Sequence, residues 1–143
     1  MKFSKKLIPL ALLSVFLLTA CYAKVSMPDE SEMNAEAVEM MHSVYRDYTA
    51  DRFAELKGDQ KFALFFHAPW CPTCRALEAN ILNNAEQLKE GVILKADYDS
   101  EVALKKEYGI RVQTSVVFFN ADGSVEKTKV NPSLKELAGF FET

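Results

Sequence analysis

The sequence predicts an α/β fold in which helices flank a central mixed sheet of four to five strands. Segments typical of strands and of helices alternate from residue 44 to the end of the chain. Near the C-terminus, two strand-like segments follow one another across Asn120-Ala121-Asp122-Gly123, a turn typical of an antiparallel hairpin. The chain has 143 residues, of which 49% are hydrophobic, enough for one compact domain.

The predicted elements follow in a regular order. Residues 61–67 form a nearly continuous apolar run, as expected of a central strand that is covered on both faces. Thr49 and Ser100 each precede a helical pattern and are suitable N-caps, and Asn131-Pro132-Ser133 begins the last helix. We expect strands at 44–48, 61–67, 92–96, 115–119 and 124–130, and helices at 49–58, 72–89, 100–109 and 131–141, with a further helical turn or two at 35–42.

The N-terminus has the pattern of an export signal. Three lysines precede an apolar stretch at 7–18, which is too short to span a membrane comfortably and is typical of a secretory signal peptide. Leu18-Thr19-Ala20-Cys21 resembles the bacterial lipobox, which implies that Cys21 is lipidated and becomes the mature N-terminus. The alternatives are an ordinary signal peptide with an incidental free cysteine, or an uncleaved anchor.

We therefore expect three segments: a lipoprotein signal peptide at 1–20, a lipidated N-terminus with a tether and short helix at 21–43, and a folded domain at 44–143. The formal net charge is −3, and removal of the three signal lysines leaves the remainder more acidic. An acidic domain without a basic patch argues against binding to nucleic acid and against electrostatic docking on anionic lipid. Export places the protein where disulfides persist.

Cys71 and Cys74 stand between the apolar run and a helical pattern. At the first turn of a helix, Cys71 would lie against unpaired backbone N–H groups and the positive end of the helix dipole. Both favour the thiolate, the species that attacks disulfides, and Pro72 suits a helix start. The alternative is half of a zinc site, but His42 and His67 are the only histidines and there is no second CxxC. The spacing thus favours a redox pair with no metal and no other cofactor.

Three local patterns in this order resemble the thioredoxin family. They are Ala68-Pro69-Trp70-Cys71-Pro72-Thr73-Cys74 after an aromatic-rich strand, the stretch 95–99 (Lys-Ala-Asp-Tyr-Asp), and the stretch 108–111 (Tyr-Gly-Ile-Arg) before a hydrophobic strand. The resemblance covers residues 44 to 143 and implies the thioredoxin fold. It also implies that Cys71 attacks a disulfide and that Cys74 resolves the mixed disulfide.

Several residues form the predicted environment of the cysteines. The resemblance implies that Trp70 flanks and shields the disulfide, a role compatible with a core aromatic. His67, four residues before Cys71, either stabilises a thiolate or is an ordinary structural residue at a strand end. Thr73 lies between the cysteines, where its hydroxyl could donate a hydrogen bond to sulfur. Lys95 either assists deprotonation of Cys74 or is a solvent-exposed lysine at a strand end.

Two positions depart from the thioredoxin pattern. Many thioredoxins bury an acidic residue beneath the second cysteine, where this chain has Phe65, so the proton of Cys74 needs another route. The family also has a cis-proline opposite the CxxC, where this chain reads Val112-Gln113-Thr114-Ser115. We expect either a trans Gln113–Thr114 bond with an altered loop or a strained cis bond, because a non-proline cis bond costs about 2.5–4 kcal/mol. This substrate loop normally keeps metals off the sulfurs.

The sequence therefore predicts an extracytoplasmic, membrane-anchored thiol–disulfide oxidoreductase that exchanges disulfides with protein thiols and is served by a membrane redox partner. Tyr22 after the lipid cysteine suggests the outer membrane if the cell has two. The alternative is a metal or iron–sulfur binding module, or a redox-inert adaptor, on the same fold. Reduction of peroxide by Cys71 ranks below both. The direction of electron transfer stays open.

Overall fold

The computed structural model describes residues 34–143, so the predicted signal peptide, Cys21 and most of the predicted tether lie outside the described residues. Among residues 34–143, no helix combines the length and apolar character that a membrane crossing requires. The elements in chain order are α1 (Ala35–Val44), β1 (Tyr45–Asp47), α2 (Ala50–Leu56), β2 (Phe62–His67), α3 (Pro72–Asn83), the 3₁₀ helix η1 (Ala85–Leu88), β3 (Val92–Asp97), α4 (Val102–Glu107), β4 (Ser115–Phe119), β5 (Val125–Val130) and α5 (Leu134–Phe141).

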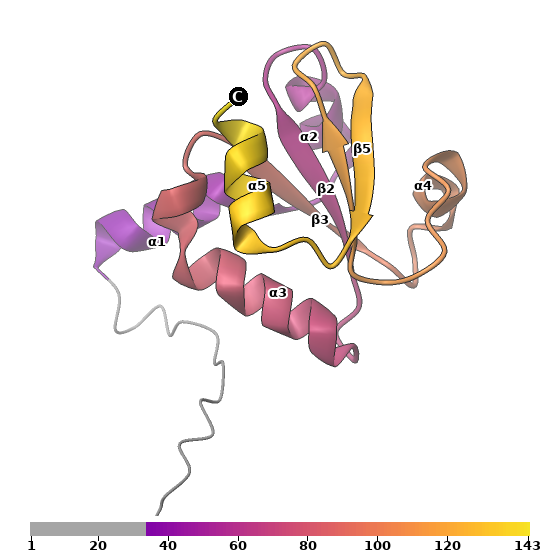
Figure 1. Ribbon diagram of the computed structural model, residues 1–143, viewed down its shortest axis with the longest axis horizontal. Coiled ribbons are helices and arrows are strands. Elements are labelled where there is room, and N and C mark those ends of the chain that lie inside the picture. Colours follow the sequence, from indigo (N-terminus) through magenta and orange to yellow (C-terminus); the bar gives the residue numbers. More distant parts are fainter. Residues whose placement is uncertain (1–33) are drawn as a thin grey trace, which may run out of the picture.

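The predicted mixed sheet is confirmed and has five strands in the order β1-β3-β2-β4-β5. Strands β1, β3 and β2 run parallel, whereas β4 pairs antiparallel with β2 and β5 antiparallel with β4. In the central register, Phe65 of β2 lies between Lys95 of β3 and Val116 of β4. Because β2 is the middle strand, its C-terminal end brings the following loop and α3 to the centre of one sheet edge (Figure 1).

Two apolar cores hold the layers together, one on each face of the sheet. Residues alternate along β2, so Phe65 faces the core shared with α1, α3 and α5, while Phe62, Leu64 and Phe66 face the core shared with α2 and α4. Figure 1 shows α1, α3 and α5 grouped together and α4 lying apart from them. All six residues of β2 are buried, which confirms the two-sided cover expected from its apolar run.

The prediction of one continuous helix from Pro72 to Lys89 is wrong. It ends at Asn83, and Asn84 leaves the helical region with φ −132° and ψ 30° before η1 begins. The Asn84 side chain donates to the carbonyl of Asn80 at 2.8 Å, and its own carbonyl accepts from Gln87 at 2.9 Å. The Asn84 side chain thus takes the Asn80 carbonyl, the acceptor that its own N–H would use in a continued helix, and this N–H donates to the Ile81 carbonyl instead.

The helix caps show one further correction. Thr49 and Ser133 cap α2 and α5 as predicted, and Ser133 forms a reciprocal capping box with Glu136. Ser100, in contrast, does not cap α4, whose N-cap is Glu101 without a side-chain bond. The hydroxyl and the N–H of Ser100 instead donate to Asp97 Oδ1 at 2.9 and 2.7 Å, because this carboxylate at the end of β3 competes for them.

Candidate redox site

The two cysteines of the described residues are free thiols at the start of α3. Cys71 is the N-cap, and its Sγ accepts a hydrogen bond from the Cys74 N–H at 3.3 Å. Pro72 occupies the first helical turn, where its missing N–H costs no hydrogen bond. The predicted helix start is thus confirmed, and the positive end of the helix lies against the Cys71 sulfur.

Cys71 is poised to ionise. Burial raises the pKa of this thiol, but hydrogen bonds from the Cys74 N–H and thiol, from the Thr114 hydroxyl and from the Thr73 N–H outweigh it and lower the pKa to about 7. These hydrogen bonds prevail over burial although the residue is only 4% exposed. A large fraction of Cys71 is therefore thiolate at neutral pH.

Cys74 has the opposite character. It is fully buried, and burial raises its pKa, while hydrogen bonds from Thr114 and from the Ala68 backbone only partly offset this effect. The sulfur of Cys71 raises the pKa of Cys74 further when it is charged. Within the pair, Cys71 is therefore the thiolate and Cys74 the thiol, the arrangement that a nucleophile and a resolving thiol require.

Thr114 lies opposite the cysteines in an unusual backbone conformation. Residues 34–143 contain no cis peptide bond, so of the two expected outcomes the trans bond with an altered loop is the one observed. Thr114 has φ +62°, a left-handed conformation that costs a residue with a Cβ about 1–2 kcal/mol. Two backbone bonds hold it there: its N–H donates to the Phe66 carbonyl at 3.0 Å and its carbonyl accepts from the Asn131 N–H at 2.8 Å.

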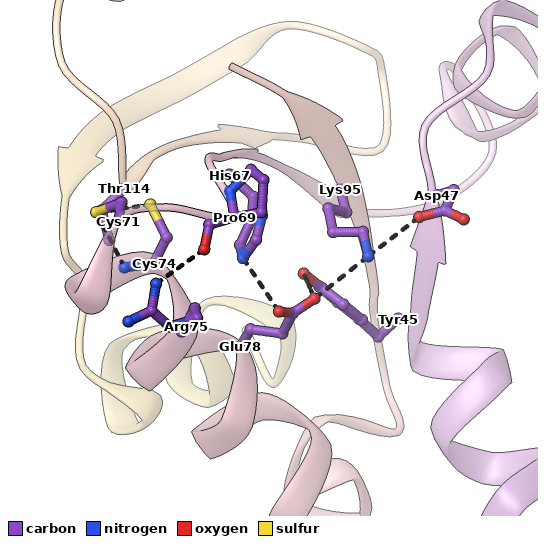
Figure 2. Close-up of polar contacts among 10 residues, drawn as sticks. All are labelled: Tyr45, Asp47, His67, Pro69, Cys71, Cys74, Arg75, Glu78, Lys95 and Thr114. Carbon is purple, nitrogen blue, oxygen red and sulfur yellow. Dashed lines mark hydrogen bonds and ion pairs between the residues drawn. The ribbon is translucent and has the colours of Figure 1, made fainter. Parts of the chain in front are cut away.

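This backbone places the Thr114 hydroxyl against both sulfurs. Oγ1 lies 3.0 Å from Cys74 Sγ and 3.6 Å from Cys71 Sγ, and the residue is 2% exposed (Figure 2). Of the two residues predicted for this loop, Thr114 contacts the sulfurs, and Gln113 is half-buried in the turn before it. The loop thus contributes a hydroxyl group to the redox pair.

A buried carboxylate lies near the site, but it comes from α3 rather than from β2. Phe65 fills the β2 position as the sequence indicates and is fully buried. Glu78, one helical turn after Cys74, is 7% exposed, and its Oε1 accepts from the Tyr45 hydroxyl at 3.1 Å and from Lys95 Nζ at 3.3 Å. Its carboxylate points away from the sulfurs, toward Tyr45 and Lys95 (Figure 2).

His67 and Lys95 both lie against the Glu78 carboxylate. His67 Nε2 lies 3.0 Å from Glu78 Oε2 without the alignment of a hydrogen bond, and its ring stands edge-on to Phe65 at 5.5 Å. Lys95 Nζ also lies 3.3 Å from the Asp47 carboxylate. The structure therefore places both predicted residues around Glu78, and their roles toward a thiolate stay predictions.

The charged forms of Glu78 and Lys95 stabilise each other. Burial raises the pKa of Glu78, but contacts with His67 and Lys95 outweigh it and hold the pKa below its usual value. Burial lowers the pKa of Lys95, and the carboxylates of Glu78 and Asp47 more than compensate and raise it. Burial and then Glu78 raise the pKa of Tyr45 well above its usual value. Glu78 is therefore an anion at neutral pH, held by neighbouring donors.

The family model for thioredoxin matches residues 44–143. The chain belongs to the thioredoxin family. This membership accounts for the expected fold, and the matched residues include the Cys71–Cys74 pair at the start of α3.

Comparisons with individual thioredoxin-family proteins agree with this family membership. The chain is 37% identical over 83 residues to a protein disulfide-isomerase of Drosophila melanogaster, which covers 54% of this chain and 17% of that protein. It is 30% identical over 86 residues to a thioredoxin of Mycoplasmoides gallisepticum, covering 57% of this chain and 85% of the relative. The crystal structure of thioredoxin f from spinach chloroplast (long form) is similar with a TM-score of 0.59 at 25% identity, over 73% of this chain and 91% of that chain.

Together, the family membership and the adjacent dithiol make residues 44–143 a thiol–disulfide oxidoreductase domain. Two residues of this domain depart from the thioredoxin pattern given under Sequence analysis. They are Phe65 in the central strand and Thr114 in the loop. Thr114 contacts the sulfurs of both cysteines, and Phe65 packs in the same core as Cys71 and Cys74.

The structure corrects the predictions made for Trp70 and Thr73. Trp70 is 56% exposed, so the core-aromatic interpretation is wrong, and its indole N–H donates to Asp99 Oδ2 at 2.8 Å. Asp99 is the last residue of the stretch 95–99, so this hydrogen bond connects two of the three local patterns described above. Thr73 is exposed and reaches Cys71 through its backbone N–H, while the hydroxyl found against the sulfurs is that of Thr114.

Sequence reasoning missed Glu78, Tyr45 and Asp47. The spacing of Glu78 is a usable signal, because an acid four residues after Cys74 lies on the same helix face as the buried thiol. Tyr45 and Asp47 carry no local signal, since only the pairing of β1 with β3 brings them to Lys95. Among residues 34–143, no group of three or more His, Cys, Asp and Glu side chains is placed to hold a metal ion.

Proposed function

We propose that the whole protein is an extracytoplasmic, membrane-anchored thiol–disulfide oxidoreductase that acts on protein thiols and disulfides. The observation that carries this proposal is the pairing of an N-capping Cys71, with its pKa lowered to about 7, with a buried Cys74 whose pKa is raised. In this proposal the dithiol is the redox group, and no other cofactor takes part.

The proposed reaction has two steps. The Cys71 thiolate attacks one sulfur of a substrate disulfide, and the other substrate sulfur leaves with the electron pair. Cys74 then attacks Cys71 Sγ and releases the second substrate sulfur, so the substrate gains two electrons and two protons while the enzyme becomes a disulfide. Run in reverse, the same steps oxidise a substrate dithiol.

The location and partners in this proposal rest on the N-terminal sequence. The basic and apolar pattern of residues 1–20 and the lipobox ending at Cys21 support export and lipid anchoring, at the outer membrane if the cell has two. A reductase outside the cytoplasm needs a membrane redox partner as electron source. The acidic net charge supports protein partners rather than nucleic acid.

The reduction potential of the Cys71–Cys74 pair tests the activity and gives its direction. Equilibration with glutathione, read by mass, is expected to show one reversible two-electron transition. A potential of about −120 to −180 mV would make the protein a disulfide donor, whereas about −270 mV would make it a reductase. The absence of any transition, with metal retained after purification, would instead support the metal or iron–sulfur module.

Expression of the full chain in a bacterial host tests the anchor. The wild-type protein is expected to partition into the detergent phase and to incorporate labelled palmitate, whereas Cys21→Ser is expected to do neither. Cys71→Ser is the matched control, since it removes a cysteine outside the lipobox. A wild-type protein that stays in the aqueous phase would overturn the anchoring but leave the redox activity untouched.

A further inference from the structure

The Thr114 hydroxyl contacts both sulfurs of the redox pair. Its Oγ1 lies 3.0 Å from Cys74 Sγ and 3.6 Å from Cys71 Sγ, and in each contact either atom can be the donor. A hydroxyl carries one proton and rotates to suit its neighbours, so it donates to one sulfur at a time. Because a charged acceptor makes the stronger hydrogen bond, the proton turns toward whichever sulfur is the thiolate.

The acid and base groups of the neighbouring cluster are directed elsewhere. His67 lies on the same face of β2 as Phe65, but its Nε2 faces the Glu78 carboxylate at 3.0 Å. The Glu78 carboxylate also binds Lys95 and points away from the sulfurs (Figure 2). The polar side chain that the structure places against the sulfurs is therefore Thr114.

The proposed reaction passes through two thiolates, and their sulfurs have different neighbours. Cys71 Sγ, at the N-cap of α3, also receives backbone N–H groups of Cys74 and Thr73. Cys74 Sγ is fully buried, and its backbone partner is Ala68. The Thr114 hydroxyl is therefore a larger share of the hydrogen bonding at Cys74, and it is also closer to this sulfur than to that of Cys71.

We propose that Thr114 is a catalytic residue whose hydroxyl donates to the Cys71 thiolate before the first attack and to the Cys74 thiolate during the resolving step. This inference rests on the proposed two-step reaction and adds to it the group that stabilises both thiolates. It holds for either direction of electron transfer, because Cys74 leaves as a thiolate when a substrate thiolate attacks Cys71 of the disulfide.

In the resolving step, the Cys74 thiol first gives its proton to a base of the solvent. The Cys74 thiolate then attacks Cys71 Sγ in line, and the bond from Cys71 to the substrate breaks with its electron pair leaving on the substrate sulfur. This sulfur lies on the far side of Cys71 from Cys74 and takes its proton from water. Thr114 keeps its own proton and acts on the attacking sulfur. The products are the Cys71–Cys74 disulfide and a substrate thiol.

The backbone around Thr114 holds the hydroxyl in this place. A left-handed φ of +62° is rare for a β-branched residue, and such outliers concentrate at functional sites. A hydrogen bond to the Phe66 carbonyl and one from the Asn131 N–H fix the residue, which is buried. Bulk water is therefore kept from the position in which it could replace the hydroxyl as a donor.

Titration of each thiol in the absence of the other tests the shared donor. Cys71→Ala leaves Cys74, and Cys74→Ala leaves Cys71. The rate of labelling by iodoacetamide is followed against pH, and peptide mapping reads the remaining thiol separately from every other cysteine of the full chain. Each variant is combined with Thr114→Val, which keeps the branched shape without the hydroxyl, and with Thr114→Ser, which keeps the hydroxyl. Thr128→Val, at an exposed threonine of β5, is the control.

We expect Thr114→Val to raise the labelling midpoint of Cys74 by about one pH unit, the lower end of the effect of a hydrogen bond to a charged group. The midpoint of Cys71 should rise by a smaller amount, because its contact with the hydroxyl is longer and backbone donors remain. Thr114→Ser should restore both midpoints, and Thr128→Val should leave them unchanged. An unchanged midpoint of either thiol in Thr114→Val would overturn the shared donor.

The resolving step gives the kinetic readout in the protein with both cysteines. Glutathione disulfide is the probe: the mixed disulfide on Cys71 forms in a single turnover, is quenched with acid and is counted by mass spectrometry. At neutral pH it should resolve about threefold more slowly in Thr114→Val, because an about tenfold loss of Cys74 thiolate is partly offset by the greater nucleophilicity of a more basic thiolate. Resolution at the wild-type rate would overturn the catalytic role.

A second variant keeps the proposal testable if Thr114→Val does not fold. Thr114→Ala loses the same hydroxyl and removes the branched side chain from the left-handed position, and it should shift the two midpoints in the same direction. Failure of this inference is distinguishable from failure of the proposed function. A reversible dithiol–disulfide transition with unshifted midpoints would overturn the role of Thr114 alone, whereas the absence of that transition would overturn the oxidoreductase activity.

Discussion

The carboxylate of Glu78 lies 3.3 Å from Lys95 Nζ, across the interface between α3 and β3. This pair joins the helix that carries both cysteines to the strand beside β2. Tyr45 and His67 complete the contacts of the carboxylate, so a single buried charge connects three strands to the catalytic helix.

Replacing Glu78 with Gln is expected to destabilise the fold by about 2 kcal/mol, because the buried hydrogen bonds to a charged acceptor become weaker. Urea unfolding of the reduced protein measures this difference. Glu86→Gln is the matched control, since Glu86 forms an exposed pair with Lys89 and is expected to change stability by less than about 0.5 kcal/mol. Equal effects of the two substitutions would contradict the importance of the buried network.

The contribution of Glu78 should disappear in acid. Its pKa is lowered in the folded protein, so its stabilisation is fully present above its ordinary value of 4.5 and is lost as the pH falls through the folded value. The difference in unfolding free energy between wild type and Glu78→Gln should therefore be constant near neutral pH and shrink below pH 4.5. A difference that grows in acid would show the opposite linkage.

Alkylation should distinguish the two thiols. The rate of Cys71 modification by iodoacetamide is expected to rise with pH with a midpoint of about 7, because the thiolate is the reacting species. Cys74 should react only at higher pH than Cys71, since burial raises its pKa. Peptide mapping by mass spectrometry assigns the label to each cysteine, and faster labelling of Cys74 at neutral pH would reverse the assigned roles.

The serine variants should separate the two chemical steps. Cys71→Ser is expected to abolish turnover of a protein disulfide, because no thiolate remains at the helix start. Cys74→Ser should still attack but should accumulate mixed disulfides, visible as adducts on non-reducing gels. Wild-type exchange activity in both variants would refute the roles given to this pair.

Most of the fold follows from local sequence, whereas the site depends on contacts that are distant in sequence. The apolar run of β2 and the capping residues Thr49 and Ser133 are local signals, and each predicts its element correctly. Ser100 failed as a predicted cap because Asp97 competes for its hydroxyl and N–H, and competition between neighbours is not visible in a propensity.

The unusual residue at position 114 was visible in the sequence, but the contact of its hydroxyl with the sulfurs was not. The absence of proline at this point predicts an altered loop, yet the direction of the hydroxyl depends on hydrogen bonds with Phe66 and Asn131, which are far away in the chain. Glu78 illustrates the same limit, because a buried acid on α3 acquires its meaning from Tyr45 and Lys95 on two strands.

The exposure of Trp70 has a practical consequence. It is the single tryptophan of the chain, it is 56% exposed, and it precedes Cys71 directly. Disulfides quench the emission of an adjacent indole more strongly than thiols do, so the tryptophan fluorescence of this protein, excited apart from its five tyrosines, comes from one position and reports the redox state of one bond. Turnover can thus be followed in real time without a label, by the brightness of a residue that the protein already carries at its active site.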